Sequence, residues 1–264
     1  MDSRKILLSA VAMFGISAQA SAADLFPPPP PMPAGGAAVA ELGTGWYLRG
    51  DIGYVDYSKP QDTPFGVAVP PLVHERLSNG WSAGAGIGYQ LTSWLRADVT
   101  ADVRNESKFY ANSSRTNFIE GFSTDRAKFD STTFLLNGYV DLGNWYGVTP
   151  YVGAGVGMAK NRLTSYTGQV TCIVASCGDP TPGASYPLGP QGLTFIPSKT
   201  DRNLAWALMA GAAIDVGSGF KIDLGYRYLN FGDARTGLDA FGVGTKLKNL
   251  DSQEVRIGAR YMID

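Results

Sequence analysis

The chain has 264 residues, a formal net charge of −1 and 17% charged residues, below the roughly 25% of ordinary soluble domains. This balance excludes the clustered Lys/Arg excess of a nucleic-acid-binding protein, and 44% hydrophobic residues exclude an intrinsically disordered chain. The length suits one domain of about 200 residues together with a removable segment.

Residues 1–22 have the pattern of a secretory signal peptide. Arg4 and Lys5 precede an apolar run from Ile6 to Ala18, and the small residues up to Ala20 or Ala22 supply an A-x-A cleavage site. The apolar run is too short for a transmembrane anchor. We therefore expect the protein to be exported and cleaved after residue 20 or 22.

Residues 23–43 form a proline-rich stretch that includes five consecutive prolines, Pro27 to Pro31. Consecutive prolines favour an extended polyproline conformation and cannot donate hydrogen bonds to a sheet. We interpret this stretch as a periplasmic spacer.

After the spacer, eight segments alternate apolar and other side chains with a period of two, which is typical of β-strands. The clearest segment runs from Leu95 to Arg104, where apolar residues alternate with Arg96, Asp98, Asp102 and Arg104. In chain order the segments span residues 46–55, 81–90, 95–104, 132–142, 151–158, 204–216, 220–228 and 254–263.

The charged residues of these segments all lie on one side of the alternation, seven acids and seven bases, and the apolar sides carry none. A lipid-facing Arg or Lys costs about 2–4 kcal/mol at the middle of a bilayer, so this distribution favours a barrel that points its charges into the lumen. The predicted lumen charge network is Arg49, Asp51, Arg96, Asp98, Asp102, Arg104, Asp141, Asp223, Arg227, Arg256 and Arg260, and the other charges on the polar sides are Asp215, Lys221 and Glu254. We expect the charges of segment 95–104 to face Asp141 on the neighbouring strand, and Arg256 and Arg260 across the lumen.

The connections alternate between short and long. Short turns are expected at 90–93, 143–149 and 217–219, and long loops at 58–79, 105–130, 160–202 and 232–252. Outer-membrane barrels have short periplasmic turns and long extracellular loops. The sequence therefore predicts an all-β fold over residues 44–264, an eight-stranded antiparallel transmembrane β-barrel with four long extracellular loops.

Aromatic residues gather near both ends of the segments, as expected of the two membrane interfaces. Those near the short turns are Trp46, Trp94, Trp145, Phe220 and Tyr261. Those toward the long loops are Tyr57, Trp81, Phe129, Trp206 and Tyr228.

Cys172 and Cys177 lie five positions apart in a Gly/Pro-rich stretch. In an exported protein this spacing suggests a small loop disulfide, with a pair of free thiols as the alternative. Two thiolates without a nearby histidine do not complete a tetrahedral metal site.

Residues 45–54 (GWYLRGDIGY), 150–157 (PYVGAGVG) and 223–228 (DLGYRY) resemble the first, fifth and seventh strands of the small outer-membrane barrels of alphaproteobacteria. That family includes surface antigens and haemin-binding proteins, and it is distantly similar to the OmpA transmembrane domain and the opacity proteins. The resemblance implies an outer-membrane location, contact with membrane lipid and lipopolysaccharide, and insertion by the barrel-insertion machinery. Such barrels usually end in an aromatic residue, whereas here Asp264 follows Ile263, so either Ile263 serves as the insertion signal or insertion is less efficient.

The expected function is that of a structural or surface-interaction protein, since eight strands leave a lumen that side chains can fill. Its long loops would then contact a host or a ligand. A low-conductance porin and a loop-based binder of haemin or another ligand are the alternatives. We predict no enzyme and no cofactor, because the single histidine, His74, lies beside Glu75 in a predicted loop and these two residues alone build no catalytic triad.

Overall fold

The computed structural model of the protein describes residues 45–66, 72–113, 121–173, 177–178, 185–186, 188–239 and 242–263. The predicted signal peptide and spacer lie outside this range. The eight longest strands are β1 (Gly45–Tyr57), β4 (Gly80–Gln90), β5 (Leu95–Ser113), β6 (Gly121–Asp141), β7 (Val148–Cys172), β11 (Lys199–Gly217), β12 (Phe220–Arg235) and β13 (Val243–Ile263). The short strands are β2 (Gln61–Gly66), β3 (Leu72–Leu77), β8 (Cys177–Gly178), β9 (Ser185–Tyr186) and β10 (Gly189–Ile196). Over the same residues we find no helix with the length and hydropathy needed to span a bilayer.

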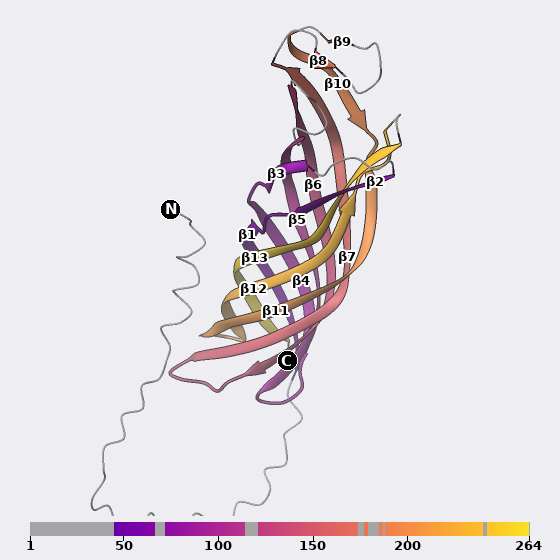
Figure 1. Cartoon of the computed structure of the whole chain (residues 1–264). Helices are drawn as coiled ribbons and strands as arrows, with labels where there is room; N and C mark the ends of the chain where they lie inside the picture. The colour runs from indigo at the N-terminus through magenta and orange to yellow at the C-terminus, as the bar shows by residue number, and fades with distance from the viewer. Residues whose placement is uncertain are drawn as a thin grey trace, which may run out of the picture. The chain divides into compact units, whose positions relative to one another are not determined.

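The eight long strands close into a ring, which confirms the predicted fold class. Each pairs antiparallel with its neighbours in the order β1-β4-β5-β6-β7-β11-β12-β13. The first and last strands pair from Trp46↔Ile263 to Tyr57↔Ser252, and this pairing leaves the sheet no open edge within the ring (Figure 1). Each of the eight predicted segments lies on one of these strands.

The short turns have conformations that suit antiparallel strand pairs. Trp145 and Val148 exchange two backbone hydrogen bonds of 2.8 and 3.0 Å around a two-residue loop. The loop residues Tyr146 and Gly147 both have positive φ, 53° and 84°, as a type I′ turn requires. This turn matches the right-handed twist of the strands and keeps the connection between β6 and β7 short.

The outward side of the ring is an apolar band bounded by aromatic pairs at both ends. Large apolar side chains at the middle of the strands, such as Val99, Leu136 and Ile257, are about half exposed. Edge-to-face or tilted aromatic pairs lie at the short-turn end (Trp46–Tyr89, Phe220–Tyr261) and at the opposite end (Tyr54–Trp81, Trp206–Tyr228). The segment from Trp46 to Tyr54 on β1 joins the two ends of the band, and its length suits the roughly 9–11 residues of a tilted transmembrane β-strand.

Two of the aromatic residues predicted for the membrane interface lie inside the barrel instead. Tyr57 is 7% exposed and Phe129 is fully buried. Tyr57 has the same parity on β1 as Val55 and Asp51, and Phe129 has the same parity on β6 as Thr133, so both side chains point inward. Their position near the strand ends suggested an interface, but the alternation of sides decides where they point.

The strands also extend well beyond their predicted ends. Residues 105–130, expected as one long loop, are largely the end of β5 and the start of β6, which stay paired as far as Asn112↔Thr124. Likewise β6 and β7 stay paired as far as Gly121↔Cys172, and β10 pairs along the far end of β7 (Figure 1).

A reversal of polarity explains why the alternation did not reveal these extensions. On β5 the pairing with β6 shifts register between Arg104 and Ser107, and both residues are buried, so the inward positions change from even to odd numbers. Beyond this bulge Phe109 and Ala111 point inward, while Lys108 is exposed. Outside the membrane the barrel is therefore apolar inside and polar outside, the reverse of its membrane-spanning part.

The lipid-facing assignment predicts the effect of a charge at Val99, which lies between Ile87 of β4 and Leu136 of β6. Val99→Arg is expected to lower the free energy of unfolding by about 2–4 kcal/mol, because the guanidinium would lie near the bilayer midplane. Val99→Leu, the matched control, should leave it within about 1 kcal/mol. Urea unfolding in lipid vesicles, followed by the heat-dependent gel migration of the folded barrel, measures both. Equal stability of the two variants would contradict the assignment.

Candidate functional site

The membrane-spanning lumen is filled by charged side chains in equal numbers. The inward-facing bases are Arg49, Arg96, Arg104, Arg227, Arg256 and Arg260, and the inward-facing acids are Asp51, Asp98, Asp102, Asp141, Asp223 and Glu254. Their side chains are at most 12% exposed. Every member of the predicted network is among them, and each lies in an ion pair.

Eight of these residues form one continuous chain of alternating charge, which we call the charge chain. It runs Arg104–Glu254–Arg227–Asp102–Arg256–Asp51–Arg49–Asp98. The members come from β1, β5, β12 and β13, so the chain crosses the lumen from one wall to the other. Buried charges require such partners, because an unpaired ion in this space would cost several kcal/mol.

Glu254 is the most connected acid of the charge chain. Its Oε1 accepts hydrogen bonds from Nε and Nη2 of Arg104 at 2.9 and 2.8 Å. Its Oε2 accepts from Nε and Nη2 of Arg227 at 2.9 and 2.6 Å. Each guanidinium group therefore donates two hydrogen bonds to one oxygen of the fully buried carboxylate, and such charge-assisted hydrogen bonds are about twice as strong as neutral ones.

Asp98 ends the charge chain within a polar cluster. Its carboxylate accepts hydrogen bonds from Arg49 at 3.0 Å, from Tyr47 at 3.0 Å and from Asn137 at 2.8 Å. Arg49 also donates to the hydroxyl of Tyr139 at 2.8 Å. Neutral side chains thus occupy the acceptor and donor positions that the ions leave open.

Two further ion pairs lie closer to the periplasmic end. Arg96 pairs with Asp141 at 3.1 Å, and its guanidinium lies 4.0 Å from the ring centre of Tyr139. Arg260 was expected to face residues of β5, but it pairs with Asp223 of β12 at 3.1 Å. On β1 the Cα partner of Arg260 is a second base, Arg49, and the guanidinium of Arg260 lies 5.4 Å from the ring centre of Tyr47, so its compensating charge comes from β12.

Glycines make room for these large side chains. A Cβ at Gly84 would lie 2.9 Å from Nη2 of Arg256 and still closer to Asp102. At Gly88 a Cβ would collide with the ring of Tyr47. The small inward residues of β4 thus leave space in the lumen, and charged and aromatic side chains of β1, β5 and β13 fill it.

A cavity of about 20 Å³ lies among the charges. It is lined by Arg49, Tyr139, Tyr151, Asp223 and Arg256, among others. A cavity of this size holds about one water molecule.

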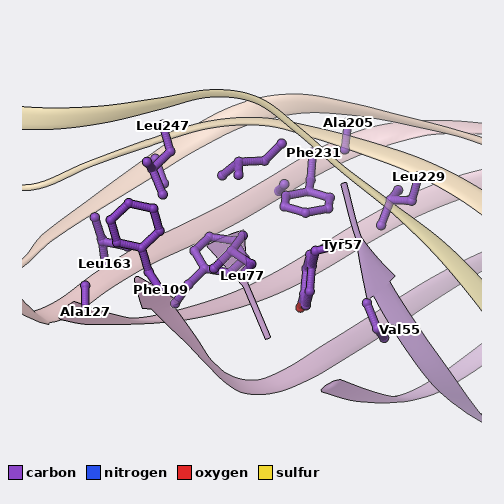
Figure 2. Close-up of a cluster of buried hydrophobic side chains, with 14 of the residues drawn as sticks. Val55, Tyr57, Leu77, Phe109, Ala127, Leu163, Ala205, Leu229, Phe231 and Leu247 are labelled. Atoms are coloured by element: carbon purple, nitrogen blue, oxygen red, sulfur yellow. The ribbon is translucent and has the colours of Figure 1, made fainter. Parts of the chain in front are cut away.

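Beyond the membrane, apolar side chains fill most of the lumen. Together with Leu135 and Ala207, which lie at membrane level, they form what we call the apolar cap. Figure 2 shows them pointing toward one another from strands all around the ring. Phe109, Phe129, Leu163, Phe231 and Leu247 are fully buried. The other members are Val55, Tyr57, Leu77, Ala111, Ala127, Leu135, Ala159, Tyr166, Ala205, Ala207, Leu229, Ala234 and Leu250.

The aromatic members of the apolar cap pack as a cluster above the charge chain. Phe129 and Phe231 stack with ring centres 5.8 Å apart, and Tyr57 meets both rings edge-on at 5.9 and 6.1 Å. The guanidinium of Arg104 lies 5.8 Å from the ring centre of Phe231. Arg104 therefore marks the boundary between the charged and the apolar layers.

Two buried acids, Asp125 and Asp201, lie at the level of the apolar cap, and Asp201 pairs with Arg235. Burial raises the pKa of the Asp125 carboxyl, and hydrogen bonds from Ser123 at 2.6 Å and Tyr166 at 3.2 Å oppose that shift. Tyr166 in turn accepts a hydrogen bond from Thr245 at 3.1 Å. This polar group links β6, β7 and β13 above the membrane.

Sequence reasoning left some lumen residues out of the network. Glu254 was assigned to the polar side of its segment but not to the network, although it lies two positions from Arg256 on the same side. Tyr47, Tyr139 and Asn137 were also on inward sides, and only their polarity could have suggested their role. No feature of the sequence specifies which acid each of them contacts.

The remaining candidate residues lie apart from the lumen. His74 is exposed on β3, and Glu75 pairs with Lys59 at 3.1 Å. Cys172 is buried at the end of β7, whereas the side chain of Cys177 lies outside the described residues, so the disulfide stays a prediction. In the described part of the chain we find no group of three His, Cys, Asp or Glu residues that could hold a metal ion.

The family of the protein follows from these features together with comparison to known proteins. Residues 6–262 match the model of the outer membrane protein β-barrel domain, and the chain belongs to this family. It is an outer-membrane protein, and the resemblance to small alphaproteobacterial barrels is confirmed.

Relatives with similar sequences include proteins of two alphaproteobacterial genera, Brucella and Rickettsia. An uncharacterised protein of Brucella abortus strain 2308 is 31% identical, with 92% of each chain covered. A protein of Rickettsia bellii strain OSU 85-389, named as a candidate adhesin, is 26% identical over 76% of this chain and 79% of its own length.

The solved structures with similar folds are also outer-membrane barrels. Neisserial surface protein A has a TM-score of 0.45 at 16% identity, with 83% of this chain and 98% of that chain covered. OprG from Pseudomonas aeruginosa has a TM-score of 0.47 at 12% identity, with 83% and 97% covered.

The two ion pairs of Glu254 predict the effect of removing its charge. Glu254→Gln leaves Arg104 and Arg227 without their shared anion and should lower the free energy of unfolding by about 3–5 kcal/mol. The control is Glu106→Gln, because Glu106 pairs with Lys128 while both side chains are about half exposed, and it should change stability by less than about 1 kcal/mol. Urea titration in vesicles measures both. A loss no larger for Glu254→Gln than for the control would show that the charge chain does not stabilise the barrel.

Proposed function

We propose that this protein is a non-catalytic, closed outer-membrane barrel that acts as a surface-interaction protein through its extracellular part. The observation that carries the proposal is the filling of the lumen at two levels. The charge chain occupies the membrane-spanning part, and the apolar cap occupies the part above it. A hydrated ion would have to displace both layers, and the 20 Å³ cavity between the charges is far too small for a continuous channel.

The extracellular part supplies a surface suited to a protein partner. Beyond the membrane, exposed apolar side chains gather on β6, on β10 and beside them, and we call this group the apolar tip: Phe122, Ile173, Leu188, Leu193 and Phe195. Phe195 is 69% exposed and Leu193 is 50% exposed, although neither lies in the lipid-facing band. Apolar groups that water surrounds in this way favour contact with another macromolecule.

The geometry of β10 adds to this surface. It pairs with β7 from Gly189↔Cys172 to Ile196↔Tyr166, with a bulge between Pro190 and Leu193. Leu193 and Phe195 lie opposite Gln169 and Thr167, so both point to the same side of the sheet. An adhesive role is in line with the Rickettsia relatives named as candidate adhesins.

A closed lumen predicts the absence of channel activity. The full-length mature protein, inserted into planar bilayers, should give no steady conductance, because no ion path avoids the two layers. A general porin inserted in the same way serves as the positive control. Steady, single-size conductance steps from the unmodified protein would overturn the closed lumen and favour the low-conductance porin.

The apolar tip predicts where adhesion depends on the protein. Bacteria that display the protein should adhere to epithelial cells more than bacteria with the empty vector. Leu193→Ser/Phe195→Ser should abolish most of that gain, because it removes apolar contact area. The control is Leu238→Ser, a residue that is 46% exposed beyond β12. Surface display of each variant is verified by antibody to an added epitope.

Failure of the displayed protein to raise adherence above the vector would contradict the surface-interaction function. Equal loss in Leu193→Ser/Phe195→Ser and in Leu238→Ser would show that adhesion does not depend on the apolar tip. Retained haemin in the displayed protein would instead favour the haemin-binding alternative.

A further inference from the structure

We propose that one side of the barrel, immediately outside the membrane, binds the phosphate groups of an outer-leaflet glycolipid. The site is a group of exposed basic residues on the outward side of β5, β6, β7 and β11, which we call the cationic patch: Lys108, Arg126, Lys128, Lys160, Arg162 and Arg202. The proposal rests on the membrane location of the barrel and does not depend on adhesion or on a closed lumen.

The position of the cationic patch relative to the lipid-facing band is the first argument. Lys160 of β7 and Arg202 of β11 are Cα partners. One pleat closer to the membrane, the partners Met158 and Leu204 are 62% and 70% exposed and face lipid. Two residues along a strand span about 7 Å, so the ammonium and guanidinium groups lie where the headgroups of the outer leaflet begin.

The second argument is that like charges face each other directly. Lys160 lies opposite Arg202, and Lys108 lies opposite Lys128. Like charges at such positions destabilise a sheet, and an anion bound between them removes the repulsion. Lys128 pairs with Glu106, but among the described residues we find no carboxylate within 4 Å of the charged groups of Lys160 or Arg202.

The two opposed pairs belong to one surface. Arg162 follows Lys160 by two positions on the same side of β7, and it lies diagonal to Lys128, whose Cα partner is Thr164. The outward acids beside these residues are Glu106 and Asp130, which pair with Lys128 and Arg162. The cationic patch has six basic residues and these two acids beside it, so its net charge is +4.

The opposite wall has a different charge at the same place. At the first outward positions beyond the lipid-facing residues Tyr54 and Val255, β1 and β13 carry Asp56 and Gln253, and Asp251 is the next outward residue of β13. An anionic lipid is therefore attracted to one side of the barrel and not to its whole circumference. Phosphate suits the cationic patch because guanidinium groups bind it in bidentate geometry, and the neighbouring Met158 and Leu204 suit the acyl chains of the same lipid.

The experiment uses the full-length mature protein in detergent micelles and diphosphorylated lipid A as the probe. Native mass spectrometry measures the fraction of protein with bound lipid A over a titration. Lys160→Ala/Arg202→Ala should weaken binding about tenfold, since each basic residue near an anionic lipid contributes severalfold. The control, Lys246→Ala/Lys248→Ala on β13, removes the same charge elsewhere and should leave binding unchanged.

Further arms test the chemistry of the ligand. Dephosphorylated lipid A should bind the unmodified protein about as weakly as diphosphorylated lipid A binds Lys160→Ala/Arg202→Ala. Millimolar inorganic phosphate should not displace bound lipid A, because it lacks acyl chains. Heat-dependent gel migration shows that each variant is folded, and if Lys160→Ala/Arg202→Ala does not fold, Lys108→Ala/Lys128→Ala tests the same surface with the same expected loss.

Three results would overturn the proposal. One is equal binding by the unmodified protein and the folded patch variant, and another is equal loss in the control on β13. The third is equal binding of phosphorylated and dephosphorylated lipid A, which would show that acyl chains alone hold the lipid.

Discussion

The structure depends on one constraint, which is that every backbone polar group within a bilayer must be satisfied inside the protein. With strands, only a closed ring meets this requirement, and the pairing of β1 with β13 closes this one. Closure at eight strands makes the lumen narrow. The polar sides of the strands then face each other across a space without bulk water, and this explains why six bases meet six acids there.

The same ring changes its character where it leaves the membrane. Within the membrane, lipid solvates the apolar side chains, so the lumen receives the polar ones. Above the membrane, water solvates the polar side chains, and the lumen receives the apolar cap. On β5 a bulge of one residue exchanges the two sides, because the period of a strand is two, whereas on β6 the odd positions stay inward and the residue types themselves change. The continuous hydrogen bonding of β5, β6 and β7 thus passes through two environments with opposite demands.

These two environments determine what could be predicted from the sequence. The strands, the inward side of each and the network members followed from alternation, because Arg and Asp cannot face lipid. The strand extensions could not be predicted in this way. Beyond the membrane the apolar side chains point inward, as in a soluble protein, and the bulge near Arg104 interrupts the alternation along β5. The prediction of Tyr57 and Phe129 at the membrane interface was wrong because it used their position near the ends of segments. Their even or odd spacing from the inward residues of the same strand would have placed them inside. The partner of Arg260 depends on the stagger between strands, and no single strand encodes that stagger.

A filled barrel has consequences for where recognition can occur. In the closed barrel that we propose, the charge chain and the apolar cap leave the lumen no room for a ligand, and recognition then takes place on outward surfaces. Two such surfaces break the pattern of their surroundings, the apolar tip in water and the cationic patch at the headgroup level. They lie on the same neighbouring strands, β6 and β7 with β10 or β11 beside them, and they meet at Thr167 of β7, which is the Cα partner of both Arg126 and Phe195. The rigid pairing of β6 with β7 over 20 registered residue pairs therefore joins a membrane-anchored cationic surface to an apolar surface that faces the cell's surroundings.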